Sequence, residues 1–260
     1  MAISDAQKNV VEDTLRRSLR NKFQNYNPEP AAMPFHTRLL GKDRLALYSF
    51  IHSLSTNFGT TIFEPVAIAL AANQFKSAKS QVISGIYIAE PAQIAIQQII
   101  DGLTTAETAP DKISEIQQIR SACLGNPTRR KVKPTRVDIW LEGHDGSLYL
   151  FDIKTAKPNA GSFKEFKRTL LEWTAAILTE DPTINVHTLI AIPYNPYAPQ
   201  PYNRWTMRGM LDLSEELKVA EEFWDFLGGQ GTFDDLLGCF ERVGLEMRHE
   251  IDTYFSRFQL

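Results

Sequence analysis

The sequence is poor in the features that mark secreted, membrane and zinc-binding proteins. Its 260 residues include two cysteines, Cys123 and Cys239, and neither belongs to a Cys-x-x-Cys pair or lies beside a histidine cluster. This excludes a disulfide scaffold and a zinc module. No apolar run is long enough to cross a bilayer, and the first residues lack the basic start and apolar stretch of a secretory signal. We therefore expect a cytoplasmic protein that does not associate with membranes.

An overall excess of positive charge is also missing, because the formal net charge is −3. The charges are distributed unevenly along the chain. Residues 129–168 contain ten basic and five acidic side chains, whereas residues 212–252 contain twelve acidic and three basic ones. A polyanion such as DNA is attracted to the first segment and repelled by the second. The composition therefore permits nucleic-acid binding but confines it to the middle of the chain.

The chain does have the size and composition of one folded domain. With 43% hydrophobic and 23% charged residues, it can bury a large core. Residues 1–125 are mainly helical in pattern, residues 126–211 contain strands and a long loop, and residues 212–260 return to helical spacing. In the middle part a hairpin is followed by a helix over residues 162–178 and a strand over residues 183–193. This order requires a crossover and predicts an α/β fold whose sheet contains a parallel pair.

Local patterns predict several further elements. Residues 38–58 predict one helix, and residues 81–88 fit either a strand or the end of a buried helix. Ser214 predicts the N-cap of a helix that continues to Leu227. On the crossover helix, Lys167 falls outside the apolar stripe and is expected on another face.

Two β-rich runs carry the charged residues on which the functional analysis depends. Residues 137–141 and 147–153 have strand patterns and are separated by a turn that contains two glycines, which predicts a β-hairpin. Asp138 lies in the first strand, whereas Asp152 and Lys154 lie in or directly after the second. Side chains two apart on a strand share a face, so a hairpin that pairs Asp138 opposite them gathers two carboxylates and an ammonium group.

Such a trio has a chemical use. Two neighbouring carboxylates repel each other unless a hard divalent cation such as Mg²⁺ lies between them. Lys154 can orient or deprotonate an attacking water, or stabilise charge on a phosphoryl transition state. The alternative is an ordinary hairpin with a surface Asp-x-Lys pair, a tripeptide that is common by chance. The context favours the metal site, because Asp152 and Lys154 accompany an apolar strand and Asp138 interrupts a second one.

These residues resemble the signature of the PD-(D/E)xK nucleases, with Val137 in place of the proline and Asp152 in place of the commoner glutamate. The whole chain, including residues 224–229 and 243–244, is similar to the type II restriction endonucleases and to the group that cuts GGNCC. The resemblance implies a restriction-endonuclease-like mixed central sheet flanked by helices, with further helices at both ends of the chain. It also implies Mg²⁺ at Asp138 and Asp152, with Lys154 at the attacking water.

Glu64 is a further candidate ligand, because a loop containing Gly59 leads into an apolar helix and Glu64 is the acid near its start. One interpretation is a carboxylate stabilised by the helix N-terminus and followed by Pro65 in the first turn. The other comes from the family resemblance, since several restriction enzymes contribute a glutamate from an early helix to the metal. The sequence leaves both interpretations open.

Two segments are candidates for contact with DNA. The first is a basic run directly before the hairpin, together with a lysine in the loop after it, where phosphate contact is favoured over a merely solvated face: Arg129, Arg130, Lys131, Lys133, Arg136 and Lys157. The second is the proline- and tyrosine-rich stretch from Tyr194, which cannot form regular structure. It is either a rigid loop that stacks its own rings or a segment that reads bases through Asn203, Arg204 and Arg208.

The leading hypothesis is a Mg²⁺-dependent type II restriction endonuclease that hydrolyses both strands of double-stranded DNA at a short near-palindromic site. Cutting both strands of such a site suggests a homodimer with one catalytic centre for each strand. A cognate DNA methyltransferase is expected in the same host. Two alternatives remain, a structure-specific or repair nuclease of the same fold and a catalytically silent DNA-binding protein.

Overall fold

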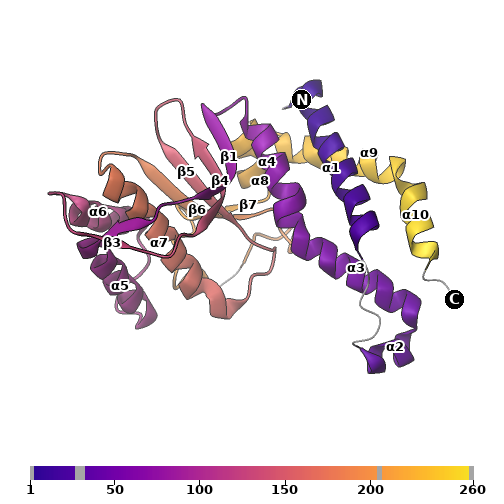
Figure 1. The fold of residues 1–260 in the computed structure, drawn as a ribbon, viewed down its shortest axis with the longest axis horizontal. Helices are drawn as coiled ribbons and strands as arrows, with labels where there is room; N and C mark the ends of the chain where they lie inside the picture. Colours follow the sequence, from indigo (N-terminus) through magenta and orange to yellow (C-terminus); the bar gives the residue numbers. More distant parts are fainter. Residues whose placement is uncertain (1–2, 27–32, 204–206, 258–260) are drawn as a thin grey trace.

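The computed structural model describes residues 3–26, 33–203 and 207–257 and is organised around one mixed β-sheet (Figure 1). Its strand order is β1-β4-β5-β6-β7; the β1–β4 and β4–β5 pairs are antiparallel, and the β5–β6 and β6–β7 pairs are parallel. The predicted mixed sheet with a crossover is therefore confirmed. The strands of this sheet are β1 (Ser77–Ile83), β4 (Arg136–Glu142), β5 (Leu148–Ile153), β6 (Val186–Ile192) and β7 (Leu217–Val219). A separate small ribbon pairs β2 (Tyr87–Ala89) with β3 (Arg129–Lys131).

Helices cover both faces of the sheet (Figure 1). Strand residues alternate between two apolar cores, so that Leu150 and Ile190 belong to one and Phe151 and Leu189 to the other. Helices α5 to α7 pack into the first core, and α1, α4, α8 and α9 pack into the second. The helical segments are α1 (Asp5–Asn25), α2 (Pro34–Leu40), α3 (Lys42–Phe58), the π-helical turn η1 (Gly59–Phe63), α4 (Glu64–Ala71), α5 (Glu90–Thr104), α6 (Lys112–Cys123), the 3₁₀ turn η2 (Ala160–Ser162), α7 (Phe163–Glu180), α8 (Glu221–Gly228), α9 (Thr232–Glu246) and α10 (Arg248–Ser256).

The sheet draws its strands from all three parts into which the sequence pattern divides the chain. Strands β4 to β6 come from residues 126–211, as expected, but β1 comes from the mainly helical first part and β7 from the last part. Residues 81–88, which the sequence left open, include the end of β1 and most of β2, with residues 84–86 between the two strands. The predicted helix over residues 38–58 is instead two helices, because Gly41 has φ of 88° and separates α2 from α3.

The predicted helix with Ser214 as its N-cap is wrong in its first part. Leu217 and Val219 are buried in β7, which pairs in parallel with β6, and the helix begins only at Glu221. Ala220 has φ of 50° and so cannot continue either a strand or a right-handed helix. Glu216 therefore does not lie in the first turn of a helix. Its side chain is instead buried in the protein core.

A cluster of four buried charges fixes this region. Lys167, which was expected outside the buried stripe of its helix, is fully buried in α7. Its Nζ atom lies 2.5 Å from Glu115 Oε2 and 2.6 Å from Glu216 Oε2. Lys112 Nζ lies 2.9 Å from the other Glu216 oxygen and donates to Thr188 Oγ1 at 2.8 Å. Two lysines thus balance two glutamates, which connects α6 and α7 to β6 and to the start of β7.

We expect Lys167→Met to lower the free energy of unfolding by about 3–5 kcal/mol, because the substitution leaves two buried carboxylates with one ammonium group. Lys164→Met, on the same helix and partly exposed, is the matched control and should change stability by less than about 0.5 kcal/mol. Urea unfolding followed by circular dichroism measures both. Equal losses in the two variants would contradict the role given to the buried cluster.

Candidate active site

The β4–β5 hairpin brings together the three residues on which the sequence analysis depends. Ile139 pairs with Phe151, so the next position outward places Asp138 beside Asp152. Asp138 Oδ2 accepts a hydrogen bond from the backbone N–H of Ile153 at 2.8 Å. Lys154 Nζ lies 2.7 Å from Asp152 Oδ1. Two carboxylates and an ammonium group therefore converge where β5 ends and β4 begins.

Glu64 joins this group from a different element. It is 3% exposed and stands at the start of α4, which continues directly from η1. The backbone N–H of Glu64 donates to the carbonyl of Gly59, so Glu64 does not lie at a free helix end. The interpretation as a carboxylate at an open helix N-terminus is therefore not supported. Its side chain instead points toward the hairpin, and π-helical turns such as η1 often accompany functional sites.

Gln81 connects Glu64 to Asp138, and the sequence analysis did not identify it. Its Nε2 atom donates to both carboxylate oxygens of Glu64, at 2.9 and 3.0 Å, and to Asp138 Oδ1 at 3.2 Å. Gln81 lies on β1 opposite Asp138, between the pairs formed by Ser80 and Val82. Its φ of 56° is unusual for a residue other than glycine. No pattern in the sequence marks a glutamine at this position.

Burial raises the pKa values of two acids of the site, Glu64 and Asp152. Burial raises the pKa of Glu64 from its usual 4.5 to about 7; the hydrogen bond from Gln81 opposes this shift, and the charge of Asp138 adds to it. Burial also raises the pKa of Asp152 to about 6, while Lys154 opposes the shift and Asp138 adds to it. Three acids near one lysine thus form a site that is short of positive charge. Such a site favours a cation.

The donor set suits a hard divalent cation, because carboxylate oxygens are the ligands that Mg²⁺ prefers. Within residues 3–26, 33–203 and 207–257, no three His, Cys, Asp or Glu side chains are gathered as a ready metal-binding group. Gln81 Nε2 lies between Glu64 and Asp138, and Lys154 Nζ lies against Asp152. Nitrogen donors thus contact the same oxygens that a cation would use. The carboxylates of Glu64, Asp138 and Asp152 are therefore ligands of the chemical type that a divalent metal ion binds.

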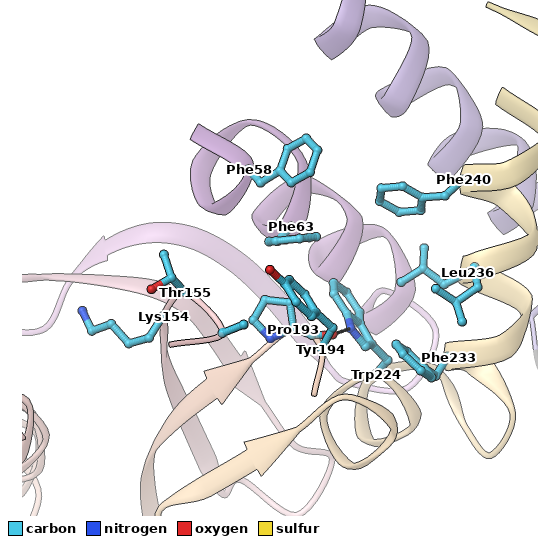
Figure 2. Close-up of a pocket in the computed structure, with 12 residues that line it drawn as sticks. Phe58, Phe63, Lys154, Thr155, Pro193, Tyr194, Trp224, Phe233, Leu236 and Phe240 are labelled. Carbon is cyan, nitrogen blue, oxygen red and sulfur yellow. Dashed lines mark hydrogen bonds between the residues drawn. The ribbon is translucent and has the colours of Figure 1, made fainter. Parts of the chain in front are cut away.

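A mainly apolar cavity of about 380 Å³ opens beside Lys154 and Thr155. Aromatic and aliphatic side chains from the ends of α3 and β6 and from η1, α8 and α9 line the rest of it. Figure 2 shows the Lys154 ammonium group directed away from the rings of Phe63 and Trp224. Its Nζ atom instead lies 4.6 Å from the centre of the Phe166 ring. The stem of Lys154 thus borders an apolar region while its charge stays with Asp152.

The basic run extends from β3 into the start of β4, and its members differ in their partners. Arg129 Nη1 lies 2.9 Å from Glu180 Oε1, and Arg130 forms an ion pair with Glu90. Arg136 Nη1 donates to the backbone carbonyl of Gln81 at 2.9 Å. The remaining two members of the run are exposed: Lys131 and Lys133.

The loop after β6 lies against the segment that follows Lys154. Tyr202 donates from its hydroxyl to the carbonyl of Ala156 at 3.1 Å, and its ring centre lies 5.9 Å from that of Tyr197. Lys157 Nζ lies 5.2 Å from the centre of the Tyr197 ring. The loop thus does stack its own rings, yet it does so next to the candidate site. Asn203 and Arg208 are exposed, and Arg204 lies outside the described residues.

Comparison with known proteins assigns the chain to a family. Residues 3–244 match the family model described as type II restriction endonuclease, HinfI. The chain belongs to the HinfI family of type II restriction endonucleases. This match spans the hairpin, Glu64 and the strands of the central sheet. The predicted family of type II restriction endonucleases, the fold class and the enzyme class, that of a site-specific deoxyribonuclease, are confirmed.

Curated relatives of this family member resemble it over most of the chain. It is 27% identical to the type II restriction enzymes HgiBI and HgiCII of Herpetosiphon aurantiacus, over 96% of this chain and 98% of each relative. It is 28% identical to the type II restriction enzyme MjaII of Methanocaldococcus jannaschii, over 86% of this chain and 67% of the relative. Across the described parts of the structure, no helix is both long and apolar enough to span a membrane.

We expect Glu64→Gln to raise the melting temperature of the metal-free restriction endonuclease at pH 8. A carboxyl group whose pKa is about 7 when folded and 4.5 when unfolded loses its proton first in the unfolded chain. Its contribution to folding therefore becomes less favourable as pH rises from about 4.5 to 7, and the amide avoids this loss. The difference in melting temperature between Glu64→Gln and the wild type should be smaller at pH 5, where Glu64 of the folded wild type keeps its proton.

Thermal unfolding in EDTA at the two pH values measures this difference. The exposed Glu241→Gln is the matched control and should show no such pH-dependent gain. A melting temperature of Glu64→Gln below that of the wild type at pH 8 would show that ionised Glu64 is stabilised in the fold.

Proposed function

We propose that this restriction endonuclease hydrolyses phosphodiester bonds of double-stranded DNA in a Mg²⁺-dependent reaction at a short near-palindromic site. The observation that carries the proposal is the meeting of Asp138, Asp152 and Lys154 at the end of the hairpin. Glu64 is held at the same place through Gln81. The proposed working unit is a cytoplasmic homodimer that contains one catalytic centre for each DNA strand.

Each residue of the site has a proposed task. Asp138 and Asp152, with Glu64, would hold Mg²⁺, which supplies charge stabilisation to a phosphate when bound. The backbone N–H of Ile153 fixes the orientation of Asp138. Asp152 holds the Lys154 ammonium group, which is directed away from the apolar cavity and can donate to a water or to a phosphate oxygen. In-line attack of that water breaks the P–O bond without a covalent intermediate.

The DNA-binding residues are proposed from their position. Strand β3, the segment that leads from it into β4 and the loop after β5 are proposed to present basic side chains to a phosphate backbone: Arg129, Arg130, Lys131, Lys133, Arg136 and Lys157. Asn203, Arg204 and Arg208 are proposed to contact base edges. GGNCC is the first target sequence to test. A cognate DNA methyltransferase in the same host would protect the host genome from this activity.

We expect Asp152→Ala to reduce cleavage by at least about 100-fold, because it removes a proposed metal ligand and the partner of Lys154. DNA binding should persist, since the substitution removes a negative charge and leaves the basic residues intact. The assay is digestion of a plasmid with Mg²⁺, followed by sequencing of the cut ends and by a filter-binding measurement. The exposed Asp145→Asn in the hairpin turn is the matched control.

The wild type should give discrete bands with one common end sequence. Cutting that depends on branched or damaged DNA would favour a repair nuclease instead. Full activity of Asp152→Ala would remove that residue from the mechanism.

We expect Lys131→Ala/Lys133→Ala to weaken binding of all DNA sequences alike, because both exposed side chains are proposed to contact phosphates. The slope of log K against log salt should fall in magnitude by about 1.8, which corresponds to two lost contacts. Fluorescence anisotropy over a range of salt concentrations measures the slope. Lys76→Ala is the control, because Lys76 lies directly before β1 and forms an ion pair with Glu142. This substitution should leave the slope unchanged. An unchanged slope in the double variant would remove the two lysines from the DNA interface.

A further inference from the structure

Helix α2 has exposed apolar side chains and no buried face within the chain. None of the residues from Pro34 to Leu40 is buried, and Phe35 and Leu39 are 84% and 82% exposed. A helix of seven residues without a packed face is unstable in water. Apolar side chains at positions four apart also lie on the same helix face. The helix therefore requires a surface that covers Phe35 and Leu39.

Helix α3 extends this exposed surface, because only one of its faces is used within the chain. Phe50 packs against Phe23 and Tyr254, with ring centres 5.7 and 5.3 Å away. Elsewhere on α3, Leu47 and Tyr48 are 44% and 60% exposed. We call five of the exposed apolar side chains on the two helices the outer α2–α3 face: Phe35, Leu39, Leu40, Leu47 and Tyr48.

The composition and place of this face argue against DNA as its partner. Its centre is apolar, whereas a phosphate backbone requires basic side chains. In Figure 1 helix α2 and the start of α3 lie at the opposite end of the molecule from β3, which carries the first three residues of the basic run. Its side chains expose roughly 600 Å² in total, which approaches the about 800 Å² that each partner contributes to a standard protein interface. A protein partner therefore fits the face better than DNA.

We propose that the outer α2–α3 face is where two copies of this chain associate around a twofold axis. The choice of a second copy rests on the proposed function, because cutting both strands requires two catalytic centres. An apolar face is self-complementary, as contact between identical surfaces requires. The face is also coupled to the site, since α3, η1 and α4 follow one another without interruption from Lys42 to Ala71 and carry Glu64. Association therefore restrains the segment that positions this acid.

The mass of the full chain in solution tests this proposal. Sedimentation equilibrium without DNA or metal should give twice the chain mass of 29.5 kDa for the wild type and 29.5 kDa for Leu39→Glu/Leu47→Glu. Both leucines are exposed, so the variant should keep the rest of the fold, and its circular dichroism spectrum should lose at most the contribution of the seven-residue helix α2. Leu124→Glu is the matched control, because this leucine is 61% exposed at the end of α6 and should leave the dimer intact.

A monomeric wild type, or a double variant that remains dimeric, would overturn the proposal. A double variant that remains dimeric but loses DNA binding would assign the face to DNA instead. The measurement does not depend on cleavage, so the two proposals can fail separately. A dimer dissociated by the double substitution supports the interface even if the wild type cuts no DNA, whereas a monomer that cuts DNA contradicts only the interface.

Discussion

The antiparallel register of β4 with β5 is the constraint on which the candidate site depends. A slip of one residue would turn the side chain of Asp138 to the opposite face of the sheet. The register is set by burial, because Ile139 and Phe151 pair and both enter the second core. It is also set by the turn, in which Gly146 adopts φ of 83° and the Gly143 N–H donates to the Ser147 carbonyl at 2.8 Å. Apolar packing and turn geometry, which take no part in the chemistry, thus determine which charges meet.

The described residues include one fully buried cluster of charges and one partly buried cluster, and the two differ in charge balance. Around Lys167 and Glu216, two lysines and two glutamates cancel, and the cluster lies deep between α6, α7 and β6. Around Asp138, three acids accompany the single ammonium group of Lys154. The first arrangement is neutral and holds elements together. The second remains negative, and burial, with a smaller contribution from the charge of Asp138, raises the pKa values of Glu64 and Asp152.

The sequence predicted the parts of the fold and site that depend on local patterns. The hairpin with Asp138, Asp152 and Lys154 was predictable because strand alternation and turn glycines lie within nineteen consecutive residues. Gln81 was not, because its position depends on the pairing of β1 with a strand more than fifty residues later. The burial of Lys167 depends likewise on Glu115 and Glu216 from other elements. Helical spacing alone cannot reveal such partners.

The ion pairs of Arg129 with Glu180 and of Arg130 with Glu90 have a consequence for selectivity. A phosphate that reaches either guanidinium must compete with a carboxylate already bound there. The net binding free energy of the phosphate is then the difference between two similar attractions, and it is smaller than the binding free energy at an unpaired arginine. Random DNA, which offers phosphates but no matching base contacts, would gain little from these two positions. In the proposed complex with DNA, Glu180 and Glu90 would thus weaken binding to random sequences, and sequence selectivity would come from the residues proposed to contact base edges.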